Sequence, residues 1–304
     1  MDSTRQALSG SHMRAELESQ PDTWARAARM TKEFALLPAP GARVAVVGCG
    51  TSWFMAQTLA SLREAAGAGV TDAFAASEAA LVPRGYDAVI ALTRSGTTTE
   101  VVDLLTDLRG RIPTVLIVGD GDSEAVHLAD RVIALPFADE QSVVQTRFPT
   151  TAIAFVRAAL GEDLTTLIED ARTAISVPID PELTGAEQYS FLGRGWTIGL
   201  AHEAALKMRE TSQSWTESYS SMEYRHGPIS VAKEGRVVWN FGPVEPGLAD
   251  EVHHTGARFE TTRLDPLADL IRVHRIALQR SEVRGLDADN PRNLTRSVIL
   301  ETRS

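Results

Sequence analysis

Three charged side chains recur at helical spacing in residues 202–211 (HEAALKMRET). Glu203, Lys207 and Glu210 occupy positions i, i+4 and i+7, which places them on one face of a helix. A carboxylate held close to an acidic carbon–hydrogen bond can transfer its proton, provided that the pKa of the carboxyl group suits the task. The same spacing is typical of an exposed helix with an ordinary Glu–Lys pair, and periodicity alone favours that interpretation. The flanking Ala-Ala-Leu run instead favours a partly buried helix.

A second candidate for chemistry is the turn Gly48-Cys49-Gly50-Thr51-Ser52, between a short β-branched run and an amphipathic segment. Glycines allow the backbone to approach a ligand closely. A helix start offers unpaired N–H groups and the positive end of the helix dipole. These donors, with the hydroxyls of Thr51 and Ser52, can hold a phosphate without a lysine. Glycine followed by Ser or Thr is equally how an ordinary helix is capped.

Another hydroxyl-rich turn, Thr93-Arg94-Ser95-Gly96-Thr97-Thr98, also lies between an expected strand and an expected helix. In a parallel sheet the carboxyl ends of the strands face the same edge, so both turns can border one crevice at a topological switch point. This juxtaposition favours a phosphate site over simple capping. The sequence lacks the P-loop pattern and the G-x-G-x-x-G fingerprint, so neither a nucleoside triphosphate nor a dinucleotide is indicated.

The elements around these turns alternate between strand and helix. Strands are expected near residues 43–47, 70–76, 88–92, 113–118, 131–135, 189–192, 236–241 and 258–264, and helices near 13–36, 52–66, 98–108, 148–160, 197–211 and 266–280. Such alternation indicates parallel pairing with right-handed crossovers. The order "strand, glycine turn, helix" occurs at 44–66 and again at 190–211, which indicates two similar α/β domains.

Composition limits the class of protein. The length of 304 residues suggests about two domains, and the net charge of −10 disfavours nucleic acid and anionic membrane surfaces as partners. No apolar run reaches the roughly 18 residues of a membrane span, and the N-terminus has no signal-peptide pattern. The single cysteine, Cys49, excludes an internal disulfide and fits a reducing compartment. We therefore expect a cytoplasmic protein without a membrane or nucleic-acid partner.

The motifs and their order resemble the sugar isomerase (SIS) domain family. GCGTS is followed by SGTTTE and by residues 140–147 (EQSVVQTR), and then by HEAALKMRET, EYRHGP (223–228) and DNPRNLTRSV (289–298). The set covers about residues 13–304 and is similar to the isomerase half of glutamine–fructose-6-phosphate transaminases. Related single-chain members are aminosugar-phosphate deaminases, isomerases and deglycases.

The resemblance implies an α/β fold of two doubly wound, flavodoxin-like SIS domains in tandem, each normally with a five-stranded parallel sheet, and a homodimer. It predicts five parts, with the second domain shortened and the tail folding over the site: a helical segment (1–40), a first SIS domain (41–165), a connector (166–186), a second SIS domain (187–286) and a tail (287–304).

Site residues follow from the same resemblance. Glu210 matches the proton-transfer glutamate, Lys207 and Glu203 match its supporting positions, and His226 matches a ring-opening histidine that the neighbouring subunit supplies. A phosphosugar is expected to bind through matching positions, with Arg94 in place of a family glutamine: Gly50, Thr51, Ser52, Thr93, Arg94, Ser95, Thr98, Val143 and Gln145. Neither a metal nor a cofactor is expected.

Three departures from the family pattern bear on the reaction. The sequence contains no glutaminase domain, so we do not expect glutamine-dependent synthesis. The lysine that forms a Schiff base in the synthase is Arg296 here, and a guanidinium does not form such imines. Only about 50 residues separate Gly235 from Gly285, so the second domain is expected to lack a strand and a helix.

Two classes of function remain open from the sequence. The first is an enzyme that moves a proton between C1 and C2 of a hexose 6-phosphate, as an isomerase or as a deaminase of glucosamine or galactosamine 6-phosphate; a fructosamine-6-phosphate deglycase is a variant of it. The second is a weakly catalytic or non-catalytic phosphosugar sensor. Arg296 is a fifth candidate catalytic residue, and together with the shortened second domain it favours the sensor. The presence of all four other candidates, Glu203, Lys207, Glu210 and His226, favours the enzyme.

Overall fold

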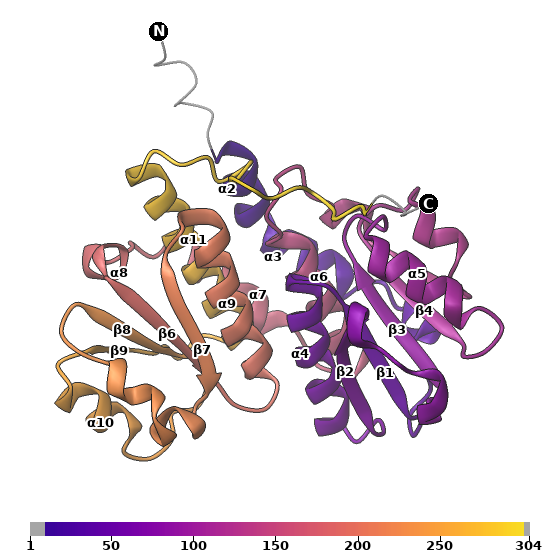
Figure 1. The fold of residues 1–304 in the computed structure, drawn as a ribbon, viewed down its shortest axis with the longest axis horizontal. Coiled ribbons are helices and arrows are strands. Elements are labelled where there is room, and N and C mark those ends of the chain that lie inside the picture. Colours follow the sequence, from indigo (N-terminus) through magenta and orange to yellow (C-terminus); the bar gives the residue numbers. More distant parts are fainter. Residues whose placement is uncertain (1–9, 301–304) are drawn as a thin grey trace, which may run out of the picture. The chain divides into compact units, whose positions relative to one another are not determined.

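The computed structural model describes residues 10–300, which divide into two compact units. The first-sheet unit contains residues 22–140, 147–164 and 295–300, and the second-sheet unit contains residues 10–21, 141–146 and 165–294. Figure 1 labels their helices and strands. Within residues 10–300, no helix is both long enough and apolar enough to cross a membrane.

The first-sheet unit is built on five parallel strands in the order β2-β1-β3-β4-β5. Their bounds are Val44–Gly48 (β1), Thr71–Ala75 (β2), Ala88–Thr93 (β3), Thr114–Val118 (β4) and Arg131–Ala134 (β5). This is the flavodoxin-like order, in which the chain leaves β1 toward one side for β2 and returns to the other side for β3. Every residue of β1, β3 and β4 is buried, as expected for parallel strands covered on both faces.

Helices cover this sheet on both faces. Alternate strand residues such as Val47, Ala91 and Leu116 pack with α5 (Thr99–Leu108) in one apolar cluster. The helices α4 (Thr51–Ala65) and α6 (Arg147–Ala159) pack against each other, and α4 also packs on β1 and β2. The segment α3 (Gln20–Ala27) contributes Trp24, whose indole N–H donates to Thr150 Oγ1 on α6 at 3.2 Å.

The second-sheet unit contains four parallel strands in the order β7-β6-β8-β9. They are β6 (Gln188–Gly193), β7 (Trp215–Ser220), β8 (Arg236–Asn240) and β9 (Arg258–Glu260). The helices of this unit are α2 (Ser11–Glu18), α7 (Thr165–Ser176), α8 (Pro181–Gly185), α9 (Thr197–Ser212), α10 (Leu248–His254) and α11 (Pro266–Val283). Of these, α9 packs against β6, β7 and α11.

The α/β class with two parallel sheets is confirmed, and several local expectations need correction. The expected helix at 13–36 consists of α2, α3 and a 3-10 turn, Glu33–Leu36, because the helix ends at Glu18 and restarts at Gln20. The strand expected at 258–264 ends at Glu260. The described second sheet has four strands and the first has five. Strand β7 and helix α10 were missed; β7 is a polar edge strand whose single buried residue is Thr216.

Candidate functional site

The first hydroxyl turn lies where β1 meets α4. A Cβ on Gly48 would lie 2.6 Å from the carbonyl carbon of Ser52, so only glycine allows the helix to start this close to the strand. Helix α4 begins at Thr51, and the Ser52 N–H donates to the Cys49 carbonyl at 3.0 Å. Both hydroxyl residues are buried, with 4% of Thr51 and 3% of Ser52 exposed. The predicted strand–turn–helix geometry is therefore present.

The surroundings of the cysteine in this turn disfavour its thiolate form. Burial, followed by the negative charge of Glu100, raises the pKa of the Cys49 thiol to about 11. The thiol is therefore protonated at neutral pH, and a protonated thiol is a poor nucleophile. What the turn offers a ligand is its backbone and its hydroxyl groups.

The second hydroxyl turn follows β3, the parallel neighbour of β1. The Thr93 hydroxyl accepts from the Gly96 N–H at 3.1 Å, and the Ser95 hydroxyl accepts from the Thr97 N–H at 3.3 Å. Each hydroxyl shapes the turn as an acceptor and keeps a proton to donate. Because β1 and β3 are adjacent and parallel, both turns lie at the same edge of the sheet, at its topological switch point.

The C-terminal segment lies against this second turn within the first-sheet unit. Buried Arg94 donates through Nη2 to the Arg296 carbonyl at 2.7 Å. The Thr98 and Ser297 hydroxyls are 3.3 Å apart, and the Thr99 N–H donates to the Val298 carbonyl at 3.1 Å. The tail thus accepts, through the Val298 carbonyl, one of the N–H groups at the start of α5.

The side chain of Arg296 is engaged in an ion pair. Its Nη2 lies 2.6 and 2.8 Å from the two carboxylate oxygens of Asp139, and its Nη1 donates to the Glu140 carbonyl. The ion pair is about one-third exposed on both sides. Arg296 therefore anchors the tail to the segment that follows β5.

Val143 and Gln145 belong to the second-sheet unit and are half-buried. Their loop is held by acidic groups that the sequence reading missed. The buried Glu16 carboxylate accepts the N–H groups of Gln141 and Ser142 at 2.5 and 3.1 Å. The Asp289 carbonyl accepts the Val143 N–H at 2.8 Å, while the Asp289 carboxylate caps α2 by accepting the His12 and Met13 N–H groups.

The three charged residues of α9 lie together inside the second-sheet unit. Lys207 Nζ is 2.8 Å from Glu210 Oε2 and 3.4 Å from Glu203 Oε1. The side chains of Glu203 and Lys207 are fully buried, and 20% of the Glu210 side chain is exposed. An exposed helix face with an ordinary ion pair is thus the wrong interpretation of the spacing, because two of the three side chains are fully buried. Lysine and glutamate are almost never fully buried unless they are paired, and here they lie next to each other.

Glu210 reaches a cavity of about 420 Å³ at the end of α9. The lining residues are Arg209, Glu210, Gln213, Ser214, Arg292, Asn293 and Leu294. Gln213 and Asn293 have positive φ angles of 51° and 66°, and they are the two non-glycine residues with this conformation in the described chain. Such backbone conformations cost energy and cluster at functional sites.

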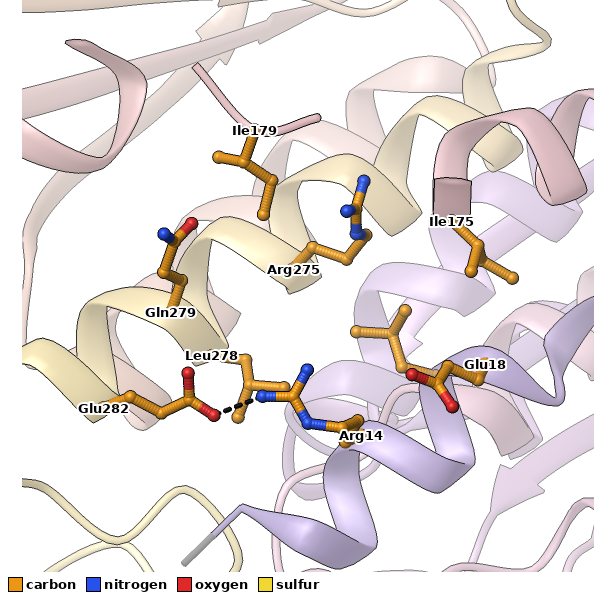
Figure 2. A pocket seen from close by; sticks show the side chains of 9 residues that line it. Arg14, Glu18, Ile175, Ile179, Arg275, Leu278, Gln279 and Glu282 are labelled. Atoms are coloured by element: carbon orange, nitrogen blue, oxygen red, sulfur yellow. Dashed lines mark hydrogen bonds and ion pairs between the residues drawn. The ribbon is translucent and has the colours of Figure 1, made fainter. Parts of the chain in front are cut away.

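A different pocket of the same unit contains none of the predicted site residues. Figure 2 shows this pocket of about 270 Å³, lined by α2, α7, α11 and Ile179. Its two arginines are engaged: Arg14 pairs with Glu282, and Arg275 donates to the carbonyls of Ala174 and Val177 at the end of α7. This pairing makes it a poor candidate for an anion site.

His226 ends a 3-10 turn, Glu223–His226, and is exposed. Gly227, which follows, has φ 135°, and a second 3-10 turn begins at Pro228. The non-helical backbone expected before Pro228 is therefore present. Among residues 10–300, no cluster of three or more His, Cys, Asp or Glu side chains is arranged to hold a metal ion.

His274 on α11 was not among the site residues predicted from the sequence. Its imidazole is fully buried, and Nε2 lies 3.9 Å from Glu203 Oε1. Burial and, secondarily, the charge of Lys207 hold the pKa of His274 well below its ordinary value. The sole signal in the sequence was a histidine within the otherwise apolar face of a helix.

Several known proteins of similar sequence or fold are enzymes of phosphorylated sugars. No protein-family model matches the chain. The glutamine–fructose-6-phosphate aminotransferase (isomerizing) of Methanothermobacter thermautotrophicus is 26% identical over 305 aligned residues, which cover 85% of this chain and 52% of that protein. The chain thus spans about half the length of the curated relatives that it matches.

Two solved structures cover nearly the whole chain. Glucosamine-6-phosphate deaminase from Thermotoga maritima aligns with a TM-score of 0.78 and 23% identity, over 94% of this chain and 99% of its own. Tagatose-6-phosphate ketose/aldose isomerase from Escherichia coli aligns with a TM-score of 0.76 and 18% identity, over 95% and 96%. The sequence relatives and the shared fold together identify the chain as a homologue of the isomerase (SIS) domain of glutamine–fructose-6-phosphate aminotransferases.

Proposed function

We propose that the chain is a phosphosugar isomerase or an aminosugar-phosphate deaminase that moves a proton between C1 and C2 of a hexose 6-phosphate. The observation that carries the proposal is the Lys207–Glu210 pair on α9. It joins a carboxylate that reaches a cavity to an ammonium group that is fully buried. A general base next to a fixed positive charge is what enolisation of a sugar requires.

In this proposal the phosphate is held at the switch point of the first sheet. The donors are backbone N–H groups at the start of α4 and the hydroxyls of Thr51, Ser52, Thr93, Ser95 and Thr98, with Gly50 allowing close approach. Arg94 adds a buried positive charge to the second turn. Hydroxyl and amide donors at a helix start suit a phosphate dianion in a chain whose net charge is −10. Val143 and Gln145 would contact the sugar.

The proposed chemistry begins with the open-chain sugar. For glucosamine 6-phosphate, Glu210 removes the proton from C2, and the electron pair forms a C1–C2 double bond as the C1 oxygen becomes an enolate. Lys207 stabilises the negative charge on that oxygen. Glu210 then returns the proton to C1 as the nitrogen lone pair forms a C2=N double bond, and the C1 oxygen takes a proton from that nitrogen, which gives a C2 imine with a C1 hydroxyl. Water hydrolyses the imine to fructose 6-phosphate and ammonia. With a hydroxyl in place of the amine, the same proton transfer is an isomerisation.

His226 is proposed to open the sugar ring, from the neighbouring subunit of a homodimer. A histidine is suited to this step because its ordinary pKa lies near neutrality. Its exposure in the single chain is consistent with a role toward a second copy. The dimer is tested by sedimentation, and the shared site by mixing a Glu210→Gln chain with a His226→Ala chain: activity should return in the mixed dimer alone.

The reaction is tested with purified protein and four substrates. Ammonia release and ketose formation are followed with glucosamine 6-phosphate and galactosamine 6-phosphate, ketose–aldose exchange with fructose 6-phosphate, and deglycation with a fructosamine 6-phosphate. Turnover of at least one is expected. Glu210→Gln should abolish turnover, by about 1,000-fold or more, and leave phosphosugar binding within about threefold. Equal rates in the two proteins would exclude Glu210 as the base.

A phosphosugar sensor is the second candidate, and one observation favours it. Arg296, which replaces the family's imine-forming lysine, is engaged by Asp139 and Glu140. Tight binding of a hexose 6-phosphate, measured by calorimetry, without turnover of any of the four substrates would favour the sensor and reject the enzyme.

A further inference from the structure

Four ionisable side chains form a buried line from α11 to the cavity at Glu210. His274 Nε2 lies 3.9 Å from Glu203 Oε1, Lys207 Nζ lies 3.4 Å from the same oxygen, and Lys207 Nζ lies 2.8 Å from Glu210 Oε2. His274, Glu203 and Lys207 are fully buried. A change of charge at Glu210 is therefore felt along the whole line, because a dry interior screens charges weakly.

The two ring nitrogens of His274 have no hydrogen-bond partner among residues 10–300. A neutral imidazole carries one N–H donor, and a buried donor without an acceptor is costly. The acidic group that His274 faces is Glu203, at a distance about 0.7 Å beyond the usual upper limit of 3.2 Å for an N–H···O bond. A small movement of either side chain would close that gap.

The proposed proton transfer supplies a reason for such a movement. When Glu210 takes the proton from the sugar carbon it becomes neutral, and Lys207 is drawn to the enolate oxygen. The Lys207–Glu203 contact, which is already long at 3.4 Å, then lengthens. Glu203 remains a fully buried carboxylate and gains from another donor at that moment. The charged group whose field acts on His274 is Lys207 of α9.

We propose that His274 is a positioning residue that donates a hydrogen bond to Glu203 when Lys207 turns toward the reacting oxygen. It thereby holds Glu203 ionised and in place while the charge on Glu210 changes. This inference rests on the proposed function, because Lys207 has no reason to turn without a charge developing on the substrate. His274 touches neither the substrate nor the reacting atoms.

The first test compares His274→Leu, which removes the donor, with His274→Gln, whose amide donates without a charge. The Leu variant should lower kcat about tenfold, as expected for the loss of one hydrogen bond to a charged group, and change KM less than about twofold. The acid limb of its kcat profile should move to higher pH by about one unit, because Glu203 then protonates more easily. The Gln variant should keep kcat and KM within about twofold of the wild-type values.

Val273→Ala is the matched control, since Val273 is a buried neighbour on the same helix. It should lower stability without moving the acid limb. Equal losses in the Leu and Gln variants, or a Leu profile that superimposes on the wild type, would overturn the role of His274.

A second test does not depend on turnover. In Lys207→Met, the Glu203 carboxylate loses its ammonium partner, so His274 should take up a proton and serve as the replacement cation. Imidazole ¹⁵N NMR of the folded variant should show a charged His274 near pH 6, where the wild-type ring is neutral. A ring that stays neutral in the variant would contradict the His274–Glu203 interaction. Absence of turnover in the wild type would instead contradict the proposed function, and with it the role of His274 during the reaction, while a charged ring in the variant would still show that His274 and Glu203 interact.

Discussion

The two strand–turn–helix connections, β1–α4 and β6–α9, both rely on a glycine at the end of the strand, but their polar groups have different partners. A Cβ on Gly48 would lie 2.6 Å from the Ser52 carbonyl carbon, and a Cβ on Gly193 would lie 2.3 Å from the Thr197 carbonyl oxygen. In each, the strand ends on a glycine and the helix four residues later packs on it. The repeated order in the sequence thus corresponds to repeated geometry.

The polar groups at the two turns have different partners. In the turn between β6 and α9, the Thr197 hydroxyl accepts the Arg194 N–H at 2.9 Å and lies 3.1 Å from the carbonyls of Arg194 and Phe241. The Arg194 side chain pairs with Glu245. The unusual chemistry of this connection lies inside the helix instead, at Glu203, Lys207 and Glu210. Under the proposed function, the β1–α4 connection binds the phosphate and the β6–α9 connection carries the reacting groups.

The largest expected effect comes from Lys207→Met, in helix α9. Removing the ammonium takes from the buried Glu203 carboxylate its close cation, which a protonated His274 replaces only in part. The variant should therefore lose up to about 3–5 kcal/mol of stability, and its kcat should fall by about 100–1,000-fold. Denaturant unfolding and the ammonia or ketose assay measure the two. The double variant with Glu203→Gln should regain most of the stability and none of the activity. A double variant as unstable as the single one would show that the buried charge is not the cause.

The next largest effects are expected from Gly48→Ala and Gly193→Ala, which test whether the strand-ending glycine is equally important in the two connections. Each new methyl group would meet backbone atoms that cannot rotate away. We expect both variants to lose stability by a similar amount, about 1–3 kcal/mol, as for other overpacked sites. Thermal and urea unfolding are the measurements. A loss confined to one of the two would show that the connections are not built alike.

The buried strands of the two sheets could be predicted from the sequence better than the edge strand β7. The buried strands β1, β3 and β6 were placed within two residues, because apolar residues form most of each strand and each strand ends on a glycine or threonine turn. The polar edge strand β7 was missed, since its residues carry no apolar pattern.

Side-chain partners distant in sequence were beyond the reach of pattern reasoning. The spacing of Glu203, Lys207 and Glu210 was visible, but their burial depends on α11 packing on α9, and so does the approach of His274. The pairing of Arg296 with Asp139 joins residues 157 positions apart, and no local pattern indicates it.

A smaller effect should separate the hydroxyls of the two connections. Ser52→Ala should weaken phosphosugar binding about tenfold, the loss of one charge-assisted donor, with a change in stability below about 1 kcal/mol. Thr197→Val should lower stability by about 1–2 kcal/mol, because the Arg194 N–H loses its acceptor, and should leave binding unchanged. Calorimetric titration with fructose 6-phosphate and urea unfolding give the two quantities; if the two variants behave alike, the division into a binding and a structural turn is wrong.

The smallest effect concerns the tail that covers the second hydroxyl turn. Asp139→Asn removes the charge that anchors Arg296, and a partly exposed ion pair contributes about 1 kcal/mol or less to stability. The local consequence should be larger than the global one, because the tail is what accepts the Thr99 N–H. Hydrogen exchange at Thr99 should therefore rise several-fold while the melting temperature barely moves. A Ser297→Ala variant is the control, since it keeps the Val298 carbonyl in place. Unchanged exchange in Asp139→Asn would show that backbone contacts alone hold the tail, and that Arg296 is available for another role.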